Sequence, residues 1–223
     1  MYRAFSTWPL FFAAILTAWV GLFAMALDMA ASGAAAELGP GMGWTNWLAL
    51  TLAGQYRALC LTLSAADPSR TGFVIIFAMW ALMSIAMMAP TAVPLLKTYR
   101  DFTLANAEQA PTQGFWTMLA GYLVVWIAFA AVATVGQHTL VHAALLSTHG
   151  LSQSALLSAA LLLAAGLYQF TSLKNACLTA CRTPMAYFMS NWQSGPGGAF
   201  KMGLHHGAVC VGCCWALMLL AFV

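Results

Sequence analysis

The chain has 223 residues, of which 62% are hydrophobic and only 6% are charged. A soluble globular domain has about 25% charged residues, so this composition excludes an ordinary soluble enzyme and a disordered chain. The net charge of +3 marks no polybasic region, and the chain is therefore not a nucleic-acid binder. The unit of organisation that fits this composition is the membrane span.

Charged residues are absent from four long stretches, at 4–27, 71–96, 109–173 and 202–223. Each stretch can hold a helix of about 20 residues, the length that crosses a hydrocarbon core, and the longest can hold two. Within that longest stretch, the polar segment from Gly136 to Gly150 predicts a hairpin. We therefore expect spans at about 8–30, 71–97, 114–136, 151–173 and 199–223.

Two further segments are ambiguous. Trp44 to Leu63 contains Gln55 and Arg57, which favours an amphipathic helix on the membrane surface. A sixth transmembrane span in this segment is the alternative. Lys174 to Trp192 either extends the fourth helix or folds back at the interface. The apolar region from Trp8 to Leu27 is longer than the 7–15 residues of a signal-peptide core, so we expect a retained first helix.

These elements predict an all-α polytopic membrane bundle with five, or six, transmembrane helices. Residues 1–223 form a single membrane domain, in which 31–70 is an extramembrane or interfacial connection. With the N-terminus in the cytoplasm, six Lys and Arg residues share that side against two on the other, as the positive-inside rule requires. We expect an integral protein of the bacterial inner membrane. The six are Arg3, Lys97, Arg100, Lys174, Arg182 and Lys201.

The cysteines gather in two groups. Cys177 and Cys181 are four residues apart, and Cys210 and Cys213 are followed by Cys214. Positions three and four apart share a helix face, and His206 adds a nitrogen one turn before Cys210. Thiolate and imidazole suit Cu(I) and zinc. The spacing alone also allows packing between membrane helices, or a redox pair.

A methionine stripe lies at a matching depth on the second helix. Met83 and Met87 are four residues apart, and Met88 follows. Met87 is ten residues before Lys97, and Cys210 is nine residues after Lys201, so both lie about 15 Å from the same side of the membrane. Pro90 and Pro94 predict an opening of this helix near the preceding turn. These methionines either pack between helices or, if the kink turns them towards the interior of the bundle, bind a metal through their thioether sulfurs.

Three motifs now resemble those of a known family. They are WALMSIAMMAPTAVP at 80–94, YQFTSLKNACLTACRTP at 168–184 and GLHHGAVCVGCCWALM at 203–218. In this order they resemble the predicted metal-binding integral membrane proteins known as domain of unknown function 2182, over residues 70–223. The family tends to have Thr-Pro-Leu-Lys where this chain has Thr171, Ser172, Leu173 and Lys174. The resemblance implies metal binding and no established reaction.

We therefore expect a membrane protein that binds, buffers or delivers Cu(I), with zinc as the alternative metal. A non-catalytic accessory or assembly subunit of a larger membrane complex is the second hypothesis, and a thiol redox or haem-linked enzyme is the third. No catalytic constellation is recognisable, so a catalytic role is not expected. The candidate ligands are Cys210, Cys213, Cys214, His206, Cys177, Cys181, Met87, Met88, Met83 and His205.

The expected partners are the lipid bilayer, subunits of a membrane complex and a protein that receives the metal. No nucleic acid is expected. His138, His142 and His149 of the predicted outer hairpin are either solvated or a further place where a metal is received.

Overall fold

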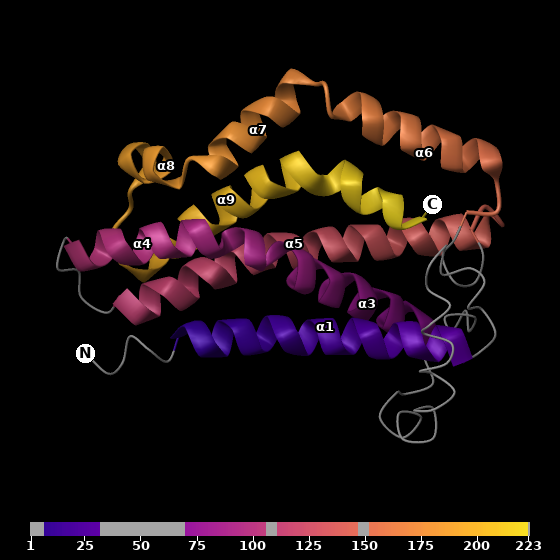
Figure 1. Cartoon of the computed structure of the whole chain (residues 1–223), viewed down its shortest axis with the longest axis horizontal. Coiled ribbons are helices and arrows are strands. Elements are labelled where there is room, and N and C mark those ends of the chain that lie inside the picture. The colour runs from indigo at the N-terminus through magenta and orange to yellow at the C-terminus, as the bar shows by residue number, and fades with distance from the viewer. Residues whose placement is uncertain (1–6, 32–69, 106–110, 147–151, 223) are drawn as a thin grey trace.

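The computed structural model describes residues 7–31, 70–105, 111–146 and 152–222, and their regular structure is helical (Figure 1). Leu146 and Ser152 form an isolated β-bridge. The elements are α1 (Thr7–Ala31), α3 (Arg70–Met88), η3 (Pro90–Ala92), α4 (Val93–Ala105), α5 (Pro111–His142), α6 (Ala155–Tyr168), α7 (Ser172–Arg182), α8 (Pro184–Asn191), α9 (Gly195–Met218) and η4 (Leu219–Phe222).

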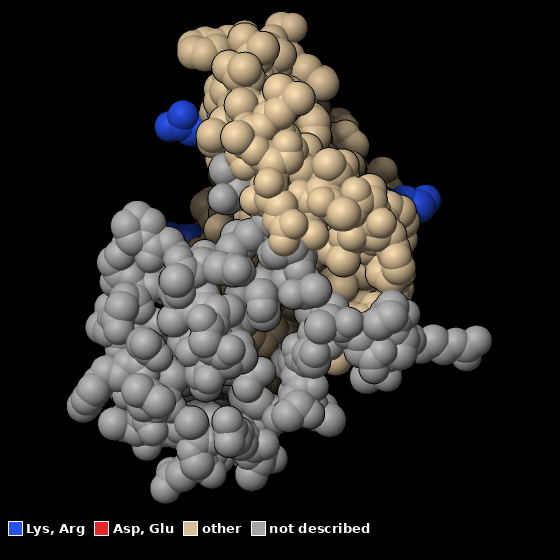
Figure 2. Space-filling model, turned by 90° about the vertical axis from the view of Figure 1, so that its right-hand side faces the viewer, with Lys and Arg blue, Asp and Glu red and all other residues tan. Residues whose placement is uncertain are grey.

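The helices run back and forth between two ends of an elongated bundle (Figure 1). The start of α1, the end of α4 and the start of α9 lie at one end, whereas α5 and α9 finish at the other. Figure 2 looks at that second end, where the visible described surface shows Lys and Arg only at its edges and no Asp or Glu.

Three helical segments are long and apolar enough to cross a membrane: Gly72–Ala105, Thr112–His142 and Gly195–Ala221. The pair α6 and α7 is bent by 63° and would make a fourth span if it crosses as one unit. Thr7–Phe23 of α1 is a shorter apolar helix. A membrane bundle is compatible with these helices, and the expected count of five or six spans stays a prediction.

The structure also corrects one boundary expected from sequence. The hairpin predicted to begin at Gly136 is wrong at its start, because α5 continues to His142. A polar composition does not by itself end a helix, since exposed polar side chains are solvated at a helix end. Lys174 to Trp192 continues from α6 after a bend of 63° and forms most of α7 and all of α8 (Figure 1). The ambiguous segment 44–63 lies outside the described residues.

The break between α3 and α4 occurs at the prolines. α3 ends at Met88, and the turn Pro90–Ala92 follows before α4 begins. The Ala92 backbone N–H donates to the Ala89 carbonyl at 3.1 Å, and so does not continue the α-helical pattern to Met88. Instead, the Met88 carbonyl accepts hydrogen bonds from the Thr91 and Tyr122 hydroxyls, at 2.7 and 2.9 Å.

The helices α5 and α9 make the most extensive helix–helix contact among the described residues, and glycines allow it. Gly203 and Gly207 lie one turn apart on α9, the spacing that lets two membrane helices approach closely. A Cβ at Gly203 would meet the Met118 carbonyl, and one at Gly207 would lie 3.0 Å from the Tyr122 carbonyl oxygen. This contact fixes Tyr122 of α5 beside the cysteine-bearing half of α9.

Candidate metal centre

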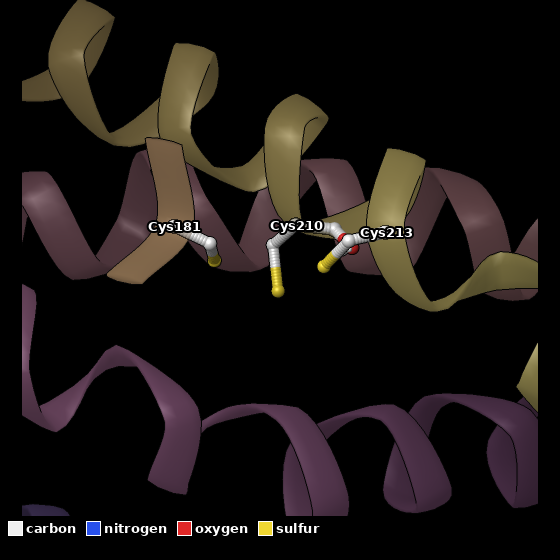
Figure 3. A group of neighbouring side chains, drawn as sticks. All are labelled: Cys181, Cys210 and Cys213. Atoms are coloured by element: carbon white, nitrogen blue, oxygen red, sulfur yellow. Dashed lines mark hydrogen bonds between the residues drawn. The ribbon is translucent and has the colours of Figure 1, made fainter. Parts of the chain in front are cut away.

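Three cysteine sulfurs converge in the interior of the bundle (Figure 3). The Sγ atoms of Cys181, Cys210 and Cys213 all lie within 4.8 Å of one another. Cys210 and Cys213 are buried, at 1% and 4% exposure, and Cys181 is half-buried. The group therefore joins α7 to α9 through sulfur atoms that are largely shielded from solvent.

The local sequence of each helix explains this convergence. Cys210 and Cys213 are three residues apart on α9 and share a face. On α7, Cys177 and Cys181 share another face, and Cys177 Sγ lies 2.9 Å from where a Cβ at Gly212 would be placed. Gly212 therefore lets α7 approach α9. The Tyr168 hydroxyl also donates to the Gly212 carbonyl, which holds the end of α6 against the same turn.

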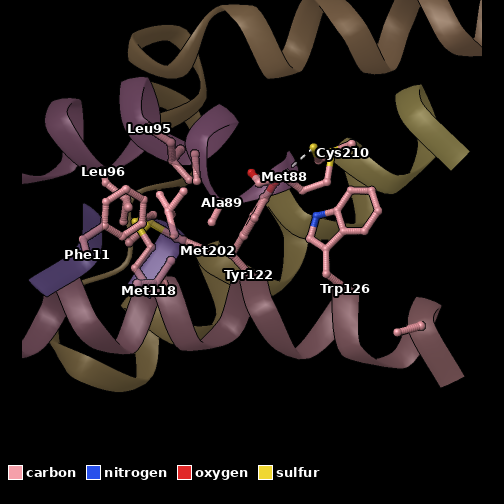
Figure 4. Packing of buried hydrophobic residues seen from close by; sticks show 14 of the residues in the cluster. Phe11, Met88, Ala89, Leu95, Leu96, Met118, Tyr122, Trp126, Met202 and Cys210 are labelled. Carbon is pink, nitrogen blue, oxygen red and sulfur yellow. Dashed lines mark hydrogen bonds between the residues drawn. The ribbon is translucent and has the colours of Figure 1, made fainter. Parts of the chain in front are cut away.

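A hydrogen-bond network surrounds Cys210 on the side of α3 and α5. The Tyr122 hydroxyl lies 3.2 Å from Cys210 Sγ and 3.1 Å from Thr91 Oγ1, and Thr91 Oγ1 lies 3.8 Å from the same sulfur. Figure 4 shows Tyr122, Met88 and Trp126 grouped beside Cys210. The Trp126 indole nitrogen is buried and has no hydrogen-bond acceptor of good geometry. The Thr91 and Tyr122 hydroxyls both donate to the Met88 carbonyl, so either would have to turn its O–H to donate to a Cys210 thiolate.

The two neighbouring histidines of α9 have different surroundings. His206 is 2% exposed, and its Nε2 lies 3.7 Å from Cys181 Sγ. His205 is exposed and stacks on Tyr187, with ring centroids 5.3 Å apart. The Tyr187 hydroxyl donates to the Met202 carbonyl at 3.1 Å, and burial raises the pKa of this phenol to about 12. His206 is therefore the histidine placed to act with the sulfurs.

The remaining candidates are distributed around this centre. Cys213 Sγ lies 3.2 Å from Cys214 Sγ, so Cys214 borders the cluster, and Cys177 lies one helical turn from Cys181. Met88 is buried in the core and Met83 packs against that core, whereas Met87 is 45% exposed. The structure thus brings together three cysteines and His206, with Cys214 and Met88 nearby and Met87 turned outward.

The donor set has a definite chemical preference. A metal ion about 2.3 Å from each sulfur would hold three sulfurs about 4 Å apart in a trigonal plane, a separation that falls within the 4.8 Å that contains all three Sγ atoms here. Thiolates prefer soft ions such as Cu(I), and also bind zinc. Adding His206 to the three sulfurs would complete a four-ligand set. The residues present therefore fit a thiophilic cation and not a hard one.

Comparison with known protein families gives a match over the part of the chain that holds the cysteines. The model of the PpoB2 family, described as a copper chaperone, matches residues 77–223. The chain belongs to this family. No curated protein and no solved structure matches the chain.

Membership in the PpoB2 copper-chaperone family bears on the expectations from sequence. The match includes every residue of the cysteine cluster and its Tyr122 network, whereas α1 lies outside it. It confirms a copper-related family, although not under the name that the motifs suggested. Copper binding is therefore supported by the family and by the donor atoms together.

Sequence reasoning did not single out Tyr122, Thr91 or Trp126 as neighbours of the cysteines. An isolated tyrosine in an apolar helix has no distinctive spacing that would mark it. The only available signal was Gly203 and Gly207 at the GxxxG spacing, which indicates close packing of α9 but does not identify its partner helix.

Proposed function

We propose that this protein is a membrane-embedded copper chaperone that carries Cu(I) between the sulfur atoms of Cys181, Cys210 and Cys213. The observation that carries the proposal is the convergence of these three sulfurs from two helices within 4.8 Å. The family description supports copper as the cargo. Bound Cu(I) would be held by thiolates, because the thiolate is the metal-binding form of cysteine.

The preference for Cu(I) follows from the charge and the surroundings of the site. Unpaired thiolates are costly to bury, and a bound cation compensates part of that charge. The wall facing Cys210 is made of Tyr122, Trp126 and Met88, which leaves little room for the hydration that hard ions retain (Figure 4). A soft monovalent ion that sheds its water readily suits such a pocket.

His206 has two roles compatible with its position. It can complete the ligand set, or it can hydrogen-bond to the Cys181 sulfur and orient it, since Nε2 lies 3.7 Å from that atom. A Cys₃His set is also a known zinc arrangement, which makes zinc the rival cargo. The affinities for the two metals therefore have to be measured on the same protein.

Delivery requires that the ion leave by ligand exchange. Cys214 and Cys177 are half-buried thiols beside the buried cluster. They provide intermediate ligands through which Cu(I) could pass from the interior towards a receiving protein. We further propose a bilayer location with the N-terminus in the cytoplasm, supported by the three helices of spanning length and by the cationic residues near that end.

The test is the metal content of the purified full-length chain after loading with Cu(I). The wild-type chain should retain about one copper against a competing chelator, and a C181S/C210S/C213S variant should retain none. C177S is the matched control, because Cys177 shares α7 with Cys181 but is not part of the cluster. Equal copper retention by the triple variant and the wild type would refute the proposed site.

A further inference from the structure

A pair of histidines lies away from the cysteine centre, at the C-terminal end of α5. His138 and His142 are one helical turn apart, and their Nε2 atoms are 3.1 Å from each other. The rings are nearly perpendicular, with centroids 4.4 Å apart. His138 is sixteen residues after Tyr122 in the same helix, which places it about 24 Å along α5 from the tyrosine that contacts Cys210.

We propose that His138 and His142 form a second metal site, which binds a divalent ion of imidazole-preferring chemistry, with Cu(II) favoured. This site is separate from the Cu(I) centre and uses none of its residues. Imidazole nitrogen suits Cu(II), nickel and zinc, and the stability order of divalent ions places Cu(II) highest among them.

The distance between the nitrogens supports ligation of one ion. Metal–imidazole bonds are about 2.0–2.1 Å long, so two nitrogens 3.1 Å apart subtend an angle of about 100° at a shared ion. That angle lies between the values of square-planar and tetrahedral sites. A linear two-coordinate Cu(I) ion would require the nitrogens to be about 4 Å apart by the same bond length, and the pair therefore favours a divalent ion.

The close approach of the two rings also favours a single ion shared by His138 and His142. A hydrogen bond between two neutral imidazoles has a donor N–H on one ring and a lone pair on the other. The two Nε2 atoms already lie next to each other, and an ion bound to both would sit about 1.3 Å to one side of the line that joins them. Binding one ion therefore requires loss of the shared proton and rotation of both rings towards the ion. The two side chains are already held close together by their spacing on the helix, and His138 also has an edge contact with Phe73.

The location allows an ion to enter and to complete its coordination. α5 has 32 residues and is about 48 Å long, which exceeds a hydrocarbon thickness of about 30 Å. Its last turn can therefore extend beyond the hydrocarbon region. His142 is exposed and is the final residue of the helix, where water can supply the other ligands and the negative end of the helix dipole favours a cation.

The test is electron paramagnetic resonance of Cu(II) added to the purified full-length chain, whose thiols are first blocked with Ag(I). Silver occupies thiols without the redox exchange that free thiols undergo with Cu(II). The expected result is one Cu(II) per chain with hyperfine coupling to imidazole nitrogen. H138A and H142A should each weaken this binding at least tenfold.

Two controls test whether Cu(II) binding depends on the positions of His138 and His142 or only on the number of histidines in the chain. H205A removes an exposed histidine of α9 that lies on another helix, and should leave the Cu(II) signal unchanged. H142A/A143H keeps the number of histidines but moves one ring by about 100° around the helix axis, and should bind as weakly as H142A. Unaltered nitrogen-coupled Cu(II) in H138A and H142A, or full binding by H142A/A143H, would overturn the proposal.

The cysteine variant distinguishes this proposal from the proposed function. C181S/C210S/C213S should lose Cu(I) and retain the Cu(II) signal of the histidine pair, whereas H138A should do the reverse. Circular dichroism of each variant checks that the helices are retained. Loss of both signals in H138A with intact helicity would refute a separate site.

Discussion

The Tyr122 hydroxyl lies 3.2 Å from the Cys210 sulfur and donates to the Met88 carbonyl at 2.9 Å. One side chain of α5 thereby joins the proline break of α3 to the cysteine face of α9. The Met88 carbonyl is available because the helical pattern ends at that residue. The break in α3 and the cysteine centre are therefore parts of one local arrangement.

Replacement of Tyr122 by Phe should weaken Cu(I) binding about tenfold, in the range found for loss of a hydrogen bond next to a metal ligand. The change removes the hydroxyl beside Cys210 and leaves the Met88 carbonyl with Thr91 alone. Competition with a Cu(I) chelator measures the effect. Y187F is the control, because it also removes a buried hydroxyl bonded to a carbonyl but no contact with a cysteine. An equal loss in both variants would indicate a general packing defect.

Substitution of Gly207 by Ala should separate α5 from α9. The new Cβ would lie 3.0 Å from the Tyr122 carbonyl oxygen and 3.1 Å from Val125, so one helix has to move. We expect both a lower thermal midpoint and weaker Cu(I) binding, measured on the same sample. The control is G136A, since a Cβ at Gly136 meets nothing within 4 Å and alanine favours a helix by up to about 1 kcal/mol. Unchanged copper affinity in G207A would show that this contact does not position the site.

The helices and the type of chemistry were largely predictable from sequence, because both depend on patterns within one segment. The charge-free stretches indicated the long helices, and the spacing of Cys210 and Cys213 indicated a shared face. The end of α5 was predicted too early, because Gln137 to His142 were interpreted as a loop when they form the last turns of the helix.

The composition of the site depended on contacts between segments, which single-helix patterns do not contain. Sequence spacing placed Cys177 and Cys181 on one helix face, yet the approach of α7 to α9 at Gly212 brings Cys181 into the cluster and leaves Cys177 beside it. In the methionine stripe, the break before Pro90 buries Met88 and exposes Met87. Helix crossing and the direction of a kink decide these outcomes.

Cu(I) binding should weaken as the pH falls. Each thiol that becomes a ligand has to release its proton, so protons compete with the metal. The apparent affinity should fall by up to about tenfold per pH unit for each proton released. Chelator competition at several pH values measures this slope. A slope of zero would contradict ligation by thiols that are protonated in the empty site.

Single serine substitutions should rank the cysteines. C181S, C210S and C213S should each reduce Cu(I) affinity by more than the roughly 10–100-fold associated with loss of an outer partner, and C177S should have a smaller effect. C214S should fall between them, since Cys214 Sγ lies 3.2 Å from Cys213 Sγ. If C177S were as damaging as C181S, the ion would lie farther along α7 than proposed.

The most direct test is X-ray absorption at the copper edge of the purified, Cu(I)-loaded chain. We predict an edge typical of Cu(I) and a first shell dominated by three sulfur atoms at about 2.2–2.3 Å, near the metal–sulfur length of thiolate sites. His206 would add at most one nitrogen. In C181S, the shell should lose one sulfur. A first shell of nitrogen and oxygen alone, or an unchanged spectrum in the C181S/C210S/C213S variant, would contradict the proposed copper centre.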